Sequence, residues 1–260
     1  MSWNPVTGCL KGCEYCYARR IAVRYGGSVE TCPDGKLHIL DAPMYADSAN
    51  SANGNGRRFR PYPYMFDPTF HRYRLGEPAK MLEPQTVFVC SMGDLLGEWV
   101  PDKWIEEVLG ACAAARWHRY LFLTKNPKRY DNMYVAPLSS YLSDLDSFML
   151  GATATNNQQL RTAYESMANW LSIEPLLEDV SGVFEACSDS ADPIKQGVRK
   201  RWDWVVIGAE TGDRKNKVPP DRKWIEDIVD VCKSWKTPVY MKNNLAPFWG
   251  NELIQQFPWE

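Results

Sequence analysis

The chain has 260 residues, with 30 Lys and Arg against 32 Asp and Glu, and 45% of its residues are hydrophobic. This is the composition of a globular protein, which excludes a disordered or fibrous chain, and a net charge near zero argues against nonspecific nucleic-acid binding by the whole surface. No apolar run approaches the roughly 18–20 residues of a membrane helix, and residues 1–5 do not open a secretory signal, so we expect a cytoplasmic protein with no membrane partner.

The first predicted strand, residues 2–6, leads into a cluster of cysteines. Cys9, Cys13 and Cys16 have the spacing C-x3-C-x2-C, with glycines at positions 8 and 12. The cytosol keeps thiols reduced, which disfavours a disulfide framework. Glycines let a short backbone turn tightly enough to aim three sulfurs at one point, and thiolates suit zinc or an iron–sulfur cluster.

The residues alone leave the identity of this site open. A structural zinc site needs a fourth ligand, for which Cys32 or His38 is the candidate. An iron–sulfur cluster with three protein ligands leaves one iron open to a ligand from outside the protein, as catalytic metal sites do. Buried thiols without any metal are the third interpretation.

With the aromatic Tyr15 directly before its last cysteine, the motif resembles the signature of the radical SAM superfamily. That resemblance implies an enzyme whose 4Fe-4S cluster is held by Cys9, Cys13 and Cys16, the catalytic cysteines. It also implies that the open iron binds S-adenosylmethionine (SAM), that reductive cleavage of SAM forms a 5′-deoxyadenosyl radical, and that this radical abstracts hydrogen from a substrate. A flavodoxin or ferredoxin would be the electron donor. Further stretches resemble a phage-borne branch of the superfamily: residues 3–5, 70–75, 87–97, 172–175 and 208–210.

Residues 26–84 are predicted to be a long loop insertion, and residues 47–56 within it to be a mobile loop, because Gly, Pro, Asn and Ser are frequent there. Residues 57–74 contain five arginines and six aromatic residues but a single acidic residue. Arginines among aromatics suit phosphates and stacked bases, so Arg72 and Arg74 are candidate substrate-binding residues, with a nucleic acid or nucleotide as partner. The same composition also fits a packed lid over a barrel, with the arginines lying against aromatic rings.

From residue 87 onward, short apolar runs alternate with helical patterns. Continuous apolar runs are typical of strands buried on both faces of a parallel sheet. Residues 101–117 and 221–235 show amphipathic stripes, which make Cys112 and Cys232 packing residues. We therefore predict an α/β fold, a full or partial (β/α) TIM-type barrel of about six or seven parallel strands in one domain over residues 1–260, with a polar insertion at 178–201. The apolar runs are residues 87–90, 120–123, 148–151, 170–173, 204–207 and 238–241.

The chemistry of a βα barrel lies at the carboxyl ends of its strands. SAM presents an ammonium, a carboxylate, ribose hydroxyls and an adenine, so its pocket needs carboxylates, hydroxyls and backbone donors. In the superfamily, the turn after the second strand binds the SAM amino group, and residues 91–94 occupy that place without the usual Gly-Gly-Glu. Each strand-end carboxylate could instead be half of an ion pair with a lysine of another strand. The predicted cofactor-binding residues are Tyr15, Ser91, Gly93, Asp94, Lys125, Thr153 and Glu174, and the predicted substrate-binding residues are Asn156, Glu210 and Lys242 with Arg72 and Arg74.

These features together predict a radical SAM enzyme that acts on a nucleoside, or on a modified base in nucleic acid. A radical SAM enzyme acting on a small metabolite or peptide is one alternative, in which case residues 57–74 form only a lid. The other is a zinc-stabilised binding protein without catalysis.

Overall fold

A parallel sheet of seven strands is the core of the fold, in the order β1-β7-β8-β9-β10-β11-β12. The prediction of an α/β fold with a partial parallel barrel of six or seven strands is confirmed. In this computed structural model the chain separates into two compact units, unit 1 with Met1–Phe122 and Pro137–Phe148 and unit 2 with Leu123–Ala136 and Met149–Glu260. The structure describes residues 1–26, 35–47, 57–133, 147–189, 202–212 and 214–260.

Unit 1 contributes the first strands of the parallel sheet. Strand β1 (Ser2–Trp3) pairs with β7 (Thr86–Val89), which in turn pairs with β8 (Arg119–Thr124). Helix α2 (Asp102–Ala114) connects the last two strands, and its stripe of large apolar residues is buried, as the amphipathic pattern predicted. Cys112 lies on this stripe and is fully buried, so its predicted packing role is confirmed.

The predicted first strand, residues 2–6, is in fact divided between two sheets. Strand β1 ends at Trp3, and β2 (Val6–Thr7) pairs antiparallel with β6 (Thr69–His71) in a separate sheet that also contains β3 (His38–Leu40). Pro5 lies at the division, because a proline has no N–H to donate to a sheet. Its carbonyl accepts the backbone N–H of His71 at 2.7 Å.

The long insertion at 26–84 therefore contains regular structure of its own. Strands β4 (Tyr45–Asp47) and β5 (Arg57–Phe59) form a two-stranded antiparallel ribbon. The predicted mobile loop at 47–56 lies outside the described residues, except at Asp47. Helix α1 (Tyr17–Tyr25) precedes the insertion, and two 3-10 turns, η1 (Arg72–Arg74) and η2 (Pro78–Lys80), close it.

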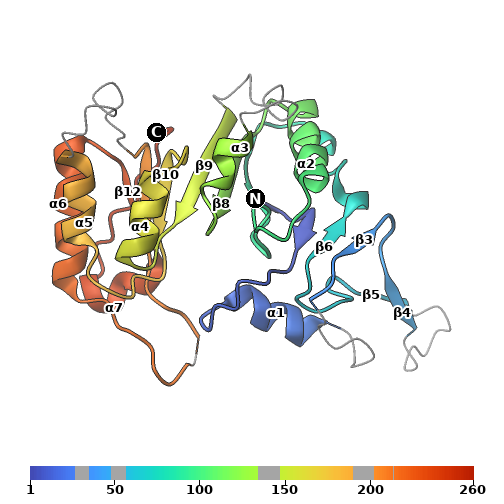
Figure 1. The fold of residues 1–260 in the computed structure, drawn as a ribbon, viewed down its shortest axis with the longest axis horizontal. Helices are drawn as coiled ribbons and strands as arrows, with labels where there is room; N and C mark the ends of the chain where they lie inside the picture. Colours follow the sequence, from blue (N-terminus) through green and yellow to red (C-terminus); the bar gives the residue numbers. More distant parts are fainter. Residues whose placement is uncertain (27–34, 48–56, 134–146, 190–201, 213) are drawn as a thin grey trace. The chain divides into compact units, whose positions relative to one another are not determined.

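Unit 2 is built from βα repeats. Its parallel strands are β9 (Phe148–Thr153), β10 (Trp170–Ile173), β11 (Trp204–Ile207) and β12 (Val239–Met241). Helix α5 packs between α4 and α6 beside these strands (Figure 1). The helices of the unit are α3 (Arg129–Met133), α4 (Asn157–Tyr164), α5 (Ser181–Asp189), α6 (Arg222–Trp235) and α7 (Ala246–Trp249), with the 3-10 turn η5 (Asn243–Leu245).

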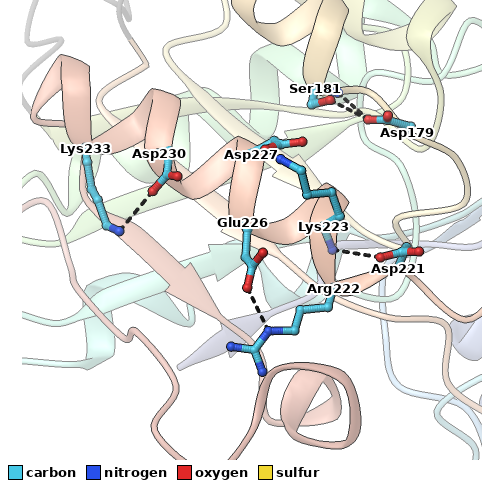
Figure 2. Close-up of polar contacts among 9 residues, drawn as sticks. All are labelled: Asp179, Ser181, Asp221, Arg222, Lys223, Glu226, Asp227, Asp230 and Lys233. Carbon is cyan, nitrogen blue, oxygen red and sulfur yellow. Dashed lines mark hydrogen bonds and ion pairs between the residues drawn. The ribbon is translucent and has the colours of Figure 1, made fainter.

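Helix α6 shows how sequence pattern decides which face is buried. Asp221 caps the helix by accepting the Lys223 backbone N–H at 2.8 Å. The inward face buries Cys232, as predicted, together with Ile225, Ile228 and Val229. Ion pairs cover the exposed face, and each contributes little to stability because solvent screens it. Figure 2 shows these pairs, Arg222 with Glu226, Lys223 with Asp227 and Lys233 with Asp230.

The polar insertion predicted at 178–201 begins with ordered structure. Asp179 accepts hydrogen bonds from the backbone N–H and the hydroxyl of Ser181, where α5 begins (Figure 2). Residues 190–201 lie outside the described part of the chain. No helix in the described residues is long and apolar enough to cross a membrane. That residues 1–260 form a single domain stays a prediction.

Candidate active site

The loop between β2 and α1 carries the three clustered cysteines. All three thiols are free and partly exposed. The Cys9 backbone N–H donates to the Phe66 carbonyl at 3.1 Å, which fixes the start of the loop to the segment that precedes β6. At the end of the loop the Cys16 sulfur accepts the Arg19 backbone N–H at 3.4 Å and so caps α1. This sulfur therefore lies at the positive end of a helix, where negative charge is stabilised.

Two glycines let the cysteine loop touch the turn that follows β7. Gly8 has φ 84°, and a Cβ there would lie 2.2 Å from the Asp67 carbonyl oxygen, so only glycine fits. Its N–H donates to the Met92 carbonyl at 2.9 Å, and it forms an isolated β-bridge with Gly93. A Cβ on Gly93 would lie 2.8 Å from the Gly8 carbonyl oxygen. The loop and the turn at residues 91–94 are therefore in direct backbone contact.

The turn at 91–94 is also held by two side chains. The Asn4 amide oxygen accepts the Met92 backbone N–H at 2.9 Å and the Ser91 hydroxyl at 3.1 Å. The Tyr17 hydroxyl donates to the Ser91 carbonyl at 2.7 Å. The turn predicted to bind the SAM amino group is thus anchored by Asn4, which lies between β1 and β2, and by Tyr17 at the start of α1.

Burial, together with nearby negative charge, opposes an isolated thiolate at Cys9. Burial raises the pKa of Cys9 to about 12, although the Lys11 backbone N–H works against this, and the Asp94 carboxylate raises it further. The thiols of Cys13 and Cys16 add to the same effect. A bound metal deprotonates such thiols outright, because its positive charge is far larger than that of any neighbouring dipole.

Three free thiols on one loop are the donor set that iron–sulfur proteins use, so these residues fit such a cluster chemically. In the described part of the chain, no group of three or more His, Cys, Asp or Glu is placed to hold a single metal ion. Cys32, a candidate fourth zinc ligand, lies outside the described residues. The other candidate, His38, stacks on Tyr64 at 3.7 Å and lies 3.6 Å from the Asp67 carboxylate.

Polar residues around the buried His71 form a network that reaches Asn4, the residue that holds the turn at 91–94. His71 is fully buried, and its Nε2 lies 2.8 Å from the Thr7 hydroxyl. Burial, assisted by the Arg74 charge, lowers the pKa of His71 to about 3, so the ring is neutral. Arg74 donates to the Asn4 carbonyl at 3.2 Å, and the Trp3 indole donates to the Arg74 carbonyl. Arg74 therefore contacts the segment that holds the turn.

Arg72 is likewise engaged within unit 1. Its guanidinium donates to Glu107 and to Asp41, each at 2.9 Å, and it lies over the Phe70 ring. Binding of substrate by Arg72 or Arg74 stays a prediction, and in this structure both guanidinium groups have intramolecular partners.

In unit 2 the strand ends bring Glu174 and Lys242 together. Glu174 follows β10, Lys242 follows β12, and their charged atoms lie 2.5 Å apart. Gly208, after the intervening β11, leaves the space, since a Cβ there would lie 3.0 Å from the Glu174 carboxyl carbon. The carboxylate–lysine ion pair that we considered as an alternative is therefore present, with 25% of the Glu174 side chain and 44% of the Lys242 side chain exposed.

Glu210 pairs with an arginine rather than with a strand-end lysine. Both of its carboxylate oxygens accept from Arg214, at 2.7 and 2.6 Å, and only 1% of its side chain is exposed. These hydrogen bonds lower the pKa of Glu210. Among the other predicted residues of unit 2, Thr153 is buried at the end of β9, Asn156 caps α4 through the Gln159 N–H, and Lys125 follows β8 partly exposed.

Comparison with known proteins places the chain in a family. The family described as "Protein of unknown function (DUF5131)" matches residues 1–253. The chain belongs to this family. No curated protein matches it. A solved structure of a mutant spore photoproduct lyase is similar, with a TM-score of 0.47, 9% identity, and coverage of 91% of this chain and 74% of that one. At this level of similarity we draw the function from the chain's own residues.

Two residues that hold the turn in this DUF5131 chain were not singled out as site residues from the sequence. Asn4 belongs to the Trp-Asn-Pro segment, where a polar side chain between a buried strand and a proline is a signal for a local anchor. Tyr17 directly follows the last cysteine of the motif, and this position beside the motif was the sequence signal for a role in the site. Tyr15, predicted to contact adenine, lies partly exposed between Cys13 and Cys16.

Proposed function

We propose that the chain is a radical SAM enzyme in which Cys9, Cys13 and Cys16 hold a 4Fe-4S cluster. The observation that carries this is the backbone contact between Gly8 and the turn at 91–94, which places a loop of three free thiols against a polar turn at the carboxyl end of β7. When bound, the reduced cluster would supply the electron that cleaves SAM to methionine and a 5′-deoxyadenosyl radical.

The turn would orient the methionine part of SAM. Asp94 is 7% exposed, its Oδ1 accepts the Leu96 backbone N–H at 3.2 Å, and its charge acts on Cys9. A carboxylate so close to a proposed cluster ligand would attract the SAM ammonium. Ser91 and Gly93 would present backbone groups, and Tyr15 would contact the adenine. The residues of unit 2 stay proposals, Lys125, Thr153 and Glu174 for the cofactor and Asn156, Glu210 and Lys242 for the substrate.

For the substrate we propose a nucleoside, or a base in nucleic acid, with flavodoxin or ferredoxin as the electron donor. The composition of residues 57–74 supports this class, because arginines lie among aromatic residues there. Membership of a phage-borne branch is likewise a proposal, which rests on the sequence resemblance.

The test is SAM cleavage by the anaerobically reconstituted chain with dithionite. We expect 5′-deoxyadenosine and methionine as products, detected by liquid chromatography and mass spectrometry. Replacing Cys9, Cys13 or Cys16 with Ala should abolish both products and the bound iron. Cys112→Ala is the matched control, because that thiol is buried in α2 and should leave cleavage intact. One equivalent of zinc without acid-labile sulfide would refute the proposal.

A further inference from the structure

The β4–β5 ribbon exposes an aromatic pair. Tyr45 and Phe59 face each other in the register of the ribbon, with ring centroids 5.9 Å apart in an edge-to-face arrangement. Tyr45 is 53% exposed and Phe59 is 40% exposed. Burial of aromatic rings is favourable, and an isolated two-stranded ribbon is only marginally stable. Exposed rings on such a ribbon therefore indicate a binding surface.

Arginines accompany these rings. Arg58 is the middle residue of β5 and is exposed, and Arg60 directly follows β5, where its backbone N–H donates to the Met44 carbonyl. Neither arginine forms an ion pair with any residue in the described ranges, whereas Arg72 pairs with two carboxylates. Successive side chains of a strand point to opposite faces, so Arg58 lies on the face opposite Phe59, and an arginine is long enough to span the about 4.8 Å between two strands.

The same part of the chain carries positive charge. Residues 1–80 contain 11 Lys and Arg against 7 Asp and Glu, and residues 81–260 contain 19 against 25. Of the 13 exposed large hydrophobic side chains in the described residues, nine lie between positions 10 and 59. Excess positive charge and exposed apolar side chains therefore lie in the same part of the chain, a combination that is complementary to a polyanion with planar, unpaired bases.

We infer that the β4–β5 ribbon binds single-stranded nucleic acid, with bases stacked on Tyr45 and Phe59 and phosphates paired with Arg58 and Arg60. As a substrate contact this rests on the proposed function, and as a binding surface it is measured without it. The inference moves the predicted nucleic-acid contact from Arg72 and Arg74, which are engaged within unit 1, to arginines that are not.

The stacking part is tested by fluorescence anisotropy on the full chain, with a labelled 20-nucleotide single-stranded DNA, an RNA of the same sequence and the DNA duplex as probes. Tyr45→Ala and Phe59→Ala should each weaken single-strand binding by about 5- to 140-fold. Tyr45→Phe keeps the ring and should bind like the wild type, which separates stacking from misfolding. Leu82→Ala is the matched control, since Leu82 is 83% exposed in unit 1 and far from the ribbon in sequence.

The electrostatic part is tested by the salt dependence of the same binding. Each phosphate contact to a single strand contributes about 0.7 to the slope of log affinity against log salt, so the double variant Arg58→Gln, Arg60→Gln should lower the slope by about 1.4. Lys103→Gln removes one positive charge from an exposed position of α2 and should leave the slope unchanged.

Several outcomes would overturn the inference. Wild-type protein that binds none of the probes at low salt would do so, as would equal affinity in Tyr45→Ala and the wild type. A dimer that Phe59→Ala dissociates would assign the ribbon to a second copy of the chain. Equal affinity for the duplex and for the single strands would also overturn the inference, because paired bases cannot stack on the two rings. Protein that cleaves SAM without binding a probe refutes this inference alone, and protein that binds without cleaving SAM refutes the proposed function alone.

Discussion

Asn4→Ala is the sharpest test of how the turn at 91–94 is held. The substitution removes the acceptor of two hydrogen bonds, from the Met92 N–H at 2.9 Å and from the Ser91 hydroxyl at 3.1 Å. Each bond is worth about 1 kcal/mol, and the N–H of Met92, a buried residue, would lose its partner, so we expect a loss of about 2–3 kcal/mol. In a chain of this size that corresponds to roughly 4–12 °C in Tm.

Thermal unfolding followed by circular dichroism measures this loss, and the KM for SAM of the reconstituted enzyme reports the position of the turn. Asn4→Asp is the control, because it keeps an acceptor oxygen and loses only the weaker contact from the amide nitrogen to the Ser2 hydroxyl at 3.3 Å. We expect Asn4→Ala to raise KM and Asn4→Asp to lie close to the wild type. A Tm for Asn4→Ala within about 1 °C of the wild type, with unchanged KM, would refute the reasoning.

Three further results are expected. Gly208→Ala should displace Glu174 from its ion pair and cost about 1–3 kcal/mol by overpacking, whereas Gly182→Ala, with nothing within 4 Å of the added Cβ, should cost nothing measurable in denaturant unfolding. Because His71 has a folded pKa of about 3 against about 6.5 when unfolded, the unfolded state binds the proton first. Stability should therefore fall as pH drops below about 6.5, by up to about 1.4 kcal/mol per unit, and His71→Gln should flatten that slope in urea titrations. Cys112→Ala should cost about 1 kcal/mol through the small cavity it leaves, as measured by Tm, while the bound iron is retained.

The strands were predictable because their pattern is local. Residues 170–173 and 204–207 are continuous apolar runs, and both form strands whose residues are all buried, as in a parallel sheet covered on two faces. The division at Pro5 was not predicted, although a proline inside a short strand was a signal for it. Strands β3 to β6 were missed because each has only three residues, too few for a periodic pattern.

The candidate site was predictable only in part. The spacing of Cys9, Cys13 and Cys16 marks the loop, but the partner of Asn4 lies 88 residues away in sequence, at Met92, and no local pattern reports such a contact. The ion pairs of Arg72 join segments 31 and 35 residues apart, so composition alone made this residue look available for a ligand.

Cys16 carries two duties in one atom. Its sulfur caps α1 by accepting the Arg19 N–H, and it is also one of the three sulfurs proposed to bind the 4Fe-4S cluster. Cys16→Ala would therefore remove the cap of α1, at a cost of about 1 kcal/mol, together with a proposed cluster ligand. Cys16→Ser keeps an oxygen that can accept the Arg19 N–H and changes the proposed ligand, so this pair of variants separates the two roles of the side chain.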